Sequence, residues 1–150
     1  MGASENSTEA LLGAVFELFR ASRRFSDTTA LALPHYSVLR LLYLRHTDAR
    51  LTEIADALGY DMSVLSRHIT IMIDQGLITR LPDPNDGRAW LLHLTEAGET
   101  RLHVAAERWL VELRRWLAEF SDADQQLCTR LINALSHGIT STAPQTRPDN

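Results

Sequence analysis

The sequence predicts a mainly helical domain with one small β-hairpin. Apolar residues recur at the spacing of helix faces through most of the 150-residue chain, and the spacing changes to that of strands over residues 77–94. Glycine or a helix-capping residue stands at several of the changes. The length favours a single domain with appended helices and is sufficient to bury a core.

The first expected helix has a wide apolar face. Leu11, Val15 and Leu18 follow one another at intervals of four and three residues, which places them on one side of a helix. We expect this helix over residues 8–30, after a flexible N-terminus over residues 1–7.

Three shorter helices are expected next. Pro34 suits the first turn of a helix that ends near residues 46–50, and a second helix follows over residues 52–58. Gly59 comes directly after it, where a helix often needs a left-handed residue. Asp61 is a good N-cap for the third helix.

The third helix runs from Met62 to about Gln75, and Gly76 ends it. Its buried stripe is expected to be Leu65, Ile69 and Met72. Two strands follow, over residues 77–81 and 89–94. They flank residues 82–87, which are rich in turn formers, so we expect a β-hairpin.

Two helices complete the chain. Thr95 is the N-cap of a long helix, and Ser121 with Asp124 resembles a capping box that opens the last one. The long helix should bury one face: Leu102, Ala106, Trp109, Leu113, Trp116 or Leu117, and Phe120. The last helix should bury another: Leu127, Leu131 and Leu135, with Cys128 and Ile132 beside them. A flexible tail is expected over residues 139–150.

Composition excludes several classes of protein. The formal net charge of -4 argues against a uniformly basic nucleic-acid coat protein, but a local basic patch remains compatible with it. All 15 basic residues are Arg, and Cys128 is the single cysteine, which excludes an intrachain disulfide and a Cys-based zinc site. We find no catalytic constellation, metal set, cofactor motif, membrane span or signal peptide, so we expect a cytoplasmic protein that is not an enzyme.

The order of elements in the middle of the chain is that of a winged helix-turn-helix. In such proteins the second helix enters the DNA major groove with its N-terminal residues toward the bases. The candidate DNA contacts on this helix are Met62, Ser63, Val64, Ser66, Arg67 and His68. The alternative is that these residues form the solvated face of an ordinary helix.

Residues 51–98 resemble the MarR family of bacterial transcription regulators. The residues that carry the resemblance are Glu53-Ile54-Ala55, Leu58-Gly59, Ser63, Ser66-Arg67, Gly76-Leu77-Ile78, Arg80, Asp83-Pro84, Asp86-Gly87-Arg88 and Leu94-Thr95-Glu96-Ala97-Gly98. The flanking helices also fit, so the resemblance extends over about residues 8–138. It implies a winged helix-turn-helix over about residues 35–98, with dimerisation helices over 8–30 and 99–138.

The resemblance also implies how the wing and the dimer work. It implies that Arg88 inserts into the minor groove, whose negative potential attracts arginine. It further implies that Asp86 supports the wing, for which Arg80 is the candidate partner. The implied partners are a second copy of the chain and double-stranded DNA with a pseudo-palindromic operator. The apolar stripes at both ends of the chain must be covered by each other or by that second copy.

Members of this family often bind a small aromatic or anionic ligand. Candidate ligand-binding residues are Phe16, Arg20, Phe25, His35, Tyr36, Tyr43 and Trp109. The alternative for each aromatic residue is a place in the core. Two further hypotheses stay open: a winged-helix interaction module without DNA binding, and a redox-responsive regulator that acts through Cys128. His103 and Glu107 could share a metal, but surface pairing is the simpler interpretation.

Overall fold

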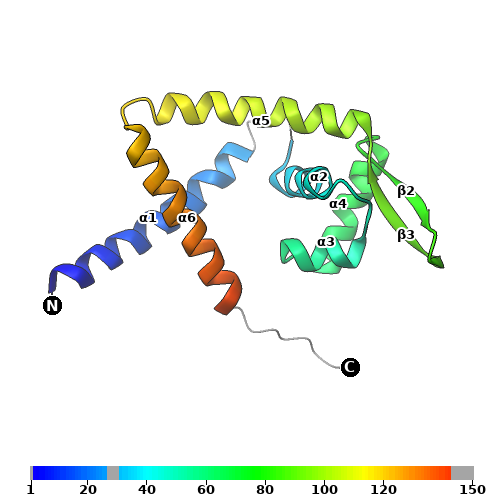
Figure 1. Cartoon of the computed structure of the whole chain (residues 1–150), viewed down its shortest axis with the longest axis horizontal. Helices are drawn as coiled ribbons and strands as arrows, with labels where there is room; N and C mark the ends of the chain where they lie inside the picture. The colour runs from blue at the N-terminus through cyan, green and yellow to red at the C-terminus, as the bar shows by residue number, and fades with distance from the viewer. Residues whose placement is uncertain (1, 27–30, 143–150) are drawn as a thin grey trace. The chain divides into compact units, whose positions relative to one another are not determined.

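The computed structural model describes residues 2–26 and 31–142, with side chains over 6–21 and 31–138. Its elements are α1 (Gly2–Ser26), α2 (Leu33–Arg45), β1 (Ala49–Arg50), α3 (Leu51–Leu58), α4 (Met62–Asp74), β2 (Ile78–Asp83), β3 (Asp86–Leu94), α5 (Glu96–Trp116) and α6 (Asp122–Thr142) (Figure 1). The expected fold class, mainly helical with a β-hairpin, is confirmed. The chain divides into two compact units, Met1–Arg108 and Trp109–Asn150.

The core of the first unit lies where α2, α3 and α4 meet the small sheet. The largest fully buried side chains come from all of these parts: Val38, Leu39, Ile54, Leu65, Ile69, Met72 and Ile78. Three of them form the stripe predicted for α4, which is therefore confirmed. Burial of this stripe fixes which side of α4 remains toward solvent.

The sheet has three antiparallel strands in the order β1-β3-β2. The hairpin is longer than expected, because β2 continues to Asp83 and β3 begins at Asp86, so the connecting loop shrinks to two residues. The sequence did not predict β1, in which Ala49 pairs with Leu92 and Arg50 with Leu91. A two-residue strand is too short for the alternation that marks strands in a sequence.

The predicted ends of the central helices are confirmed. Gly59 and Gly76 both have positive φ, at 67° and 69°, as left-handed residues after a helix should. The Thr95 hydroxyl accepts from the backbone N–H of Gly98 at 3.0 Å and donates to the Gly76 and Leu77 carbonyls. It thereby caps α5 and ties its first turn to the end of the preceding helix.

The capping box at the start of α6 is also confirmed. The Asp124 backbone N–H donates to the Ser121 hydroxyl at 3.2 Å, and the Asp124 carboxylate accepts from the Ser121 backbone N–H at 3.1 Å. Two donors at the helix start are thus satisfied reciprocally.

Three expected helix limits were wrong. α1 begins at Gly2 rather than near residue 8, because its polar first turns carry no apolar periodicity that could mark them. α5 ends at Trp116, before the turn that contains Phe120. α6 continues to Thr142 rather than 138. Residues 27–30 of the first expected helix and 143–150 of the expected tail lie outside the described residues.

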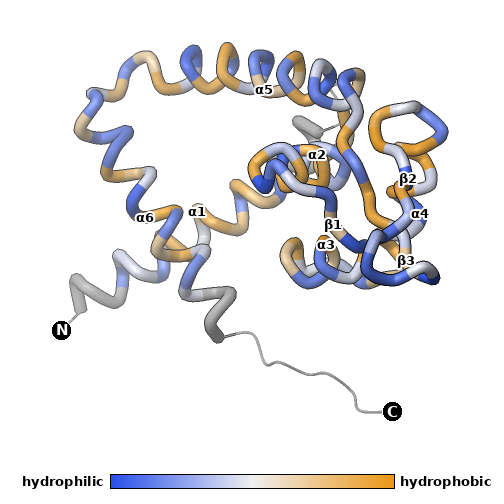
Figure 2. Tube along the Cα trace, turned by 45° about the vertical axis from the view of Figure 1, so that its right-hand side comes forward, coloured by the Kyte–Doolittle hydropathy of each residue, from blue (hydrophilic) through white to orange (hydrophobic). Residues whose placement is uncertain are grey.

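Apolar residues recur along α1, α6 and the second half of α5 (Figure 2), and large apolar side chains on all three are exposed. They include Leu11, Leu12, Phe16, Leu18, Phe19, Leu110, Val111, Leu113, Trp116, Leu127, Leu131, Ile132 and Leu135. Cys128 was expected to be buried with this last stripe, but it is exposed in the single chain because the stripe itself is uncovered. Within the described residues, no helix is both long and apolar enough to span a membrane.

Candidate nucleic-acid interface

The N-terminus of α4 is capped by a carboxylate. The Asp61 side chain accepts from the backbone N–H of Ser63 at 2.7 Å, from that of Val64 at 3.4 Å, and from the Ser63 hydroxyl at 2.5 Å. These hydrogen bonds, led by the one from the Ser63 hydroxyl, hold the pKa of Asp61 below its usual value. Asp61 therefore caps α4 and places an exposed carboxylate at the start of the helix.

Most of the predicted contact residues on α4 face solvent. Met62 and Val64 are 41% and 43% exposed, although both are apolar, and Ser63 and Arg67 are exposed beside them. Ser66 is half-buried. Exposed apolar residues next to a hydroxyl and a guanidinium form a mixed surface of the kind that reads base edges and thymine methyl groups.

His68 differs from the other candidates because its ring turns inward. Its Nδ1 lies 3.2 Å from Nε2 of His35 on α2, and the two rings meet edge to face at 5.2 Å. His68 is half-buried and His35 is buried. Burial lowers the pKa of His35, and the neighbouring His68 lowers it further. His68 thus links α4 to α2, and the DNA contact expected of it stays a prediction.

The wing carries Arg88 near its tip, on an exposed stretch of β3. The backbone N–H of Arg88 donates to the Asp86 carboxylate at 3.1 Å, which holds the start of the strand. At the other side of the two-residue turn, the backbone N–H of Asn85 donates to Asp83 at 2.8 Å. Both aspartates therefore stabilise the turn through backbone groups, as short polar side chains commonly do.

The two aspartates also share a cation from another strand. Arg50 of β1 donates to the Asp83 carboxylate through Nε at 2.8 Å, and its terminal nitrogen lies 3.7 Å from the Asp86 carboxylate. The Asp83 side chain is only 5% exposed. The backbone N–H of Asn85 and then Arg50 hold the pKa of Asp83 below its usual value. We call Arg50, Asp83 and Asp86 the Arg50 cluster.

The Arg50 cluster corrects one prediction and supplies a residue that the sequence did not reveal. The expected partner of Asp86 was Arg80, but Arg80 is an exposed residue of β2 opposite Leu92, and the ion pair of Asp86 is made with Arg50. Arg50 lies 33 residues before Asp83 in the chain. No local pattern could have indicated this contact, because it depends on the pairing of β1 with β3.

The candidate ligand residues are spread over several elements. His35, Tyr36 and Tyr43 lie on α2, where Tyr36 and Tyr43 pack partly buried against the core. Phe16 and Arg20 are exposed on α1, and Arg20 pairs there with Glu17. Trp109 is half-buried and belongs to the second unit, and the side chain of Phe25 lies outside the described residues.

The two residues considered as metal ligands, His103 and Glu107, are both exposed on α5. His103 lies 3.6 Å from Glu99, not from Glu107 as expected, because α5 offers both carboxylates at four-residue spacing. Among the residues that the structure describes, no group of three or more His, Cys, Asp or Glu side chains is arranged to hold a metal ion.

A helix-turn-helix followed by a wing, with cations exposed on both, defines a winged-helix DNA-binding protein. This chain belongs to the MarR family, whose model matches residues 31–90. The HTH-type transcriptional regulator YxaD of Bacillus subtilis (strain 168) is 30% identical over 99 residues, which cover 63% of this chain and 69% of the relative. The protein is therefore an HTH transcriptional regulator and not an enzyme.

Solved structures share the fold. The MarR family transcription regulator SP03579 has a TM-score of 0.76 at 22% identity, with 97% of this chain and 100% of that chain covered. The PcaV transcriptional regulator of Streptomyces coelicolor, solved in complex with its natural ligand, has a TM-score of 0.69 at 23% identity, with 83% and 89% covered.

Proposed function

We propose that the protein is a dimeric, sequence-specific repressor whose binding to DNA is modulated by a small aromatic or phenolic acid. One observation carries the DNA-binding part: the exposed first turns of α4 and the exposed Arg88 belong to one compact unit, joined by the sheet. Met62, Ser63, Val64 and Arg67 read the major groove, and Ser66 contributes from its half-buried position. Arg88 enters the adjacent minor groove.

The dimer is supported by the exposed apolar side chains of α1, α5 and α6. So many large exposed apolar side chains are uncommon on a monomer, and exposed apolar surface of this kind marks a protein interface. A two-fold dimer presents two recognition helices to two half-sites about one helical turn apart, so its operator is pseudo-palindromic. A dimer that occupies such a site excludes other proteins from it, which accounts for repression.

The ligand part is supported by an aromatic and cationic residue set and by one relative. PcaV was solved with its natural ligand bound. Here the candidates are Phe16 and Arg20 on α1 and Tyr36 and Tyr43 on α2, and the Arg20 guanidinium suits a carboxylate. A thermal-shift screen of aromatic acids against wild type and Arg20→Gln tests this part. We expect a shift in wild type that the variant reduces, and equal shifts would remove Arg20 from the site.

Arg88→Ala tests the DNA-binding part. Fluorescence anisotropy would follow binding to the DNA upstream of the protein's own coding sequence over a range of salt concentrations. We expect Arg88→Ala to bind all sites more weakly while the fold and the dimer persist. The slope of log affinity against log salt should become shallower by about 0.9 for each phosphate that the variant no longer neutralises.

Arg40→Ala is the matched control, because Arg40 is an exposed arginine of α2 and belongs to neither α4 nor the wing. It removes the same charge and should leave affinity close to that of wild type. Equal losses in the two variants would mean that total charge, not the wing, determines binding. Absence of wild-type binding at low salt would overturn the proposal and favour a protein-interaction module.

A further inference from the structure

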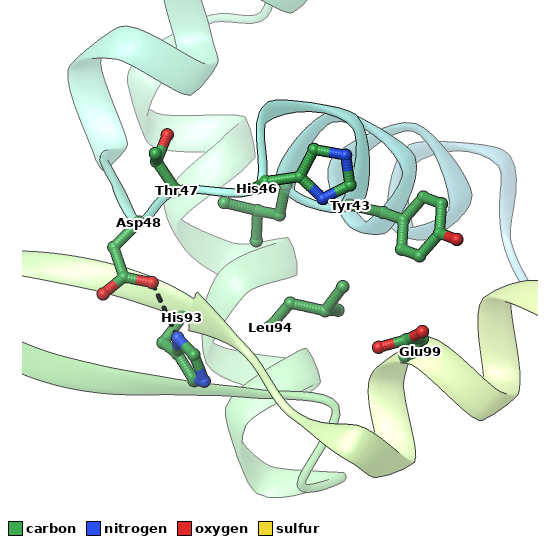
Figure 3. Close-up of a pocket in the computed structure, with 8 residues that line it drawn as sticks. Tyr43, His46, Thr47, Asp48, His93, Leu94 and Glu99 are labelled. Carbon is green, nitrogen blue, oxygen red and sulfur yellow. Dashed lines mark hydrogen bonds and ion pairs between the residues drawn. The ribbon is translucent and has the colours of Figure 1, made fainter.

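An open hollow of about 350 Å³ lies beside the sheet, within the first unit (Figure 3). It is lined by Leu42, Tyr43, His46, Thr47, Asp48, His93, Leu94 and Glu99. These residues come from the end of α2, the connection to β1, the end of β3 and the first turns of α5. Its size is at the lower end of the range for small-molecule sites.

The two carboxylates of the hollow, Asp48 and Glu99, stand at opposite sides. Asp48 and His93 lie at one side, where the Asp48 carboxylate is 2.6 Å from His93 Nδ1, while Tyr43 and Glu99 lie at the other (Figure 3). Because a carboxylate only accepts hydrogen bonds, the His93 Nδ1–H donates to it. The hollow therefore presents two carboxylates, separated by apolar and aromatic surface.

Tyr43 belongs to a row of three rings. The His103 ring meets it edge to face at 5.1 Å with an interplanar angle of 87°, and the His46 ring lies 5.9 Å away on a tilted plane. His103 also lies 3.6 Å from Glu99. Contacts with these two rings restrain Tyr43, which lines the hollow together with Glu99 as an aromatic wall.

The two carboxylates and the Tyr43 ring favour a positively charged ligand. Two carboxylates repel an organic acid, whereas an ammonium group gains an ion pair with Glu99 and a cation–π contact with the Tyr43 ring. Hydrogen-bond donors at the far end of such a ligand would find Asp48 as an acceptor. A single exposed ion pair contributes little, so the two carboxylates and the aromatic wall must act together.

We propose that the hollow is a binding site for a small aromatic amine, held by Glu99 and Tyr43 at its ammonium end and by Asp48 at the other. This site shares Tyr43 with the residues suggested for an acid and uses none of the others. Asp48 directly precedes β1, where Arg50 holds both wing aspartates. A ligand that hydrogen-bonds to Asp48 in place of His93 therefore binds next to the strand that carries Arg50, which supports the wing.

Isothermal titration of the full chain at pH 8 tests the site with two probes of the same ring and opposite charge. The probes are tyramine and 4-hydroxyphenylacetate. We expect tyramine to bind at least tenfold more tightly than the acid, and we expect Glu99→Gln and Asp48→Asn each to weaken tyramine binding at least fivefold. Glu107→Gln on the same helix and Asp56→Asn on α3 remove equal charges from exposed positions outside the hollow, and both should bind as wild type does.

The outcomes separate this site from the proposed function. Equal binding of the two probes, or equal losses in the site variants and their controls, would overturn the site. DNA affinity, measured on the same preparation with saturating tyramine, should fall severalfold, and unchanged affinity would overturn the link to the wing. Tyramine binding in a preparation that fails to bind DNA would retain the site and refute the regulator proposal alone. Circular dichroism of each variant excludes loss of fold as the cause.

Discussion

At the scale of single residues, the two exposed arginines that we propose as DNA contacts have different expected roles. Arg67 lies on the exposed face of α4. It is two residues before buried Ile69, which places it on the side of the helix opposite the core. If it pairs with a guanine edge in the major groove, its removal affects some base pairs and not others. Arg88 is proposed to enter the minor groove and respond to its shape and potential, so its removal should affect all sites.

Arg67→Ala should relax sequence preference. We expect a loss of about 1–3 kcal/mol at operators with the preferred base pair and little change at others. Competition binding with a library of single-base operator variants measures this. A uniform loss across the library would instead assign Arg67 to a phosphate.

The His35–His68 contact should make stability depend on pH. The pKa of His35 is lowered from 6.5 in the folded protein by burial and by His68, so the unfolded chain binds more protons below that pH. Stability therefore falls as the pH drops below 6.5, and the loss is complete once the pH is below the folded pKa. Above pH 6.5 this group has no effect.

Denaturant titrations of wild type and His35→Gln between pH 5 and 8 test this expectation. Gln retains a polar partner for His68 and removes the titrating group, so its free energy of unfolding should decline less steeply below pH 6.5. His137→Gln, at an exposed position of α6, is the control that should behave as wild type. Parallel profiles for wild type and His35→Gln would contradict the expectation.

At the scale of elements, the start of α5 lies unusually close to the end of α4. A Cβ placed on Gly98 would lie 2.0 Å from the carbonyl oxygen of Leu77, which is backbone and cannot rotate away. That carbonyl also accepts from the Thr95 hydroxyl, so the two elements are joined at one point. Glycine is required here for close approach rather than for its backbone angles.

Gly98→Ala should therefore destabilise the protein by about 1–3 kcal/mol, the usual cost of overpacking. Thermal and denaturant unfolding measure it. Gly138→Ala is the matched control, because a Cβ there meets nothing within 4 Å and alanine favours helix by up to about 1 kcal/mol. A neutral Gly98→Ala would mean that the two elements can separate without cost.

The difference between what could and could not be predicted follows the range of the interactions. Gly59, Asp61 and Thr95 were assigned from the sequence because a cap involves residues within one helix turn. Arg50 was missed because its partners lie across the sheet. The contact of His68 with His35 was missed because periodicity alone cannot show a contact with another helix.

At the scale of the whole molecule, the exposed apolar faces explain the wrong expectation for Cys128. Leu127, Leu131 and Leu135 do form one stripe on α6, as predicted, but they are 40–48% exposed in the single chain. Helical spacing indicates which residues need cover and does not indicate what covers them. In the proposed dimer the second copy provides the cover.

Leu131→Asp should disrupt the dimer and with it tight DNA binding, because each monomer then contacts one half-site alone. Light scattering after size exclusion would show a lower mass, or aggregation of the uncovered faces, and anisotropy would show the loss of affinity. Leu44→Asp is the control, since Leu44 is a comparably exposed leucine on α2. A Leu131→Asp protein of unchanged mass and affinity would contradict the dimer through α6.

The Arg50 cluster has a consequence for the operator itself. Arg50 immediately precedes α3, and its guanidinium holds both ends of the wing turn, so the helix-turn-helix and the wing are fastened to each other through one side chain. If α4 and Arg88 contact DNA as proposed, the protein fixes the distance between the base pairs at α4 and the minor groove at Arg88. Regulatory DNA could vary the spacing between two half-sites during evolution, but an insertion within a half-site would abolish recognition.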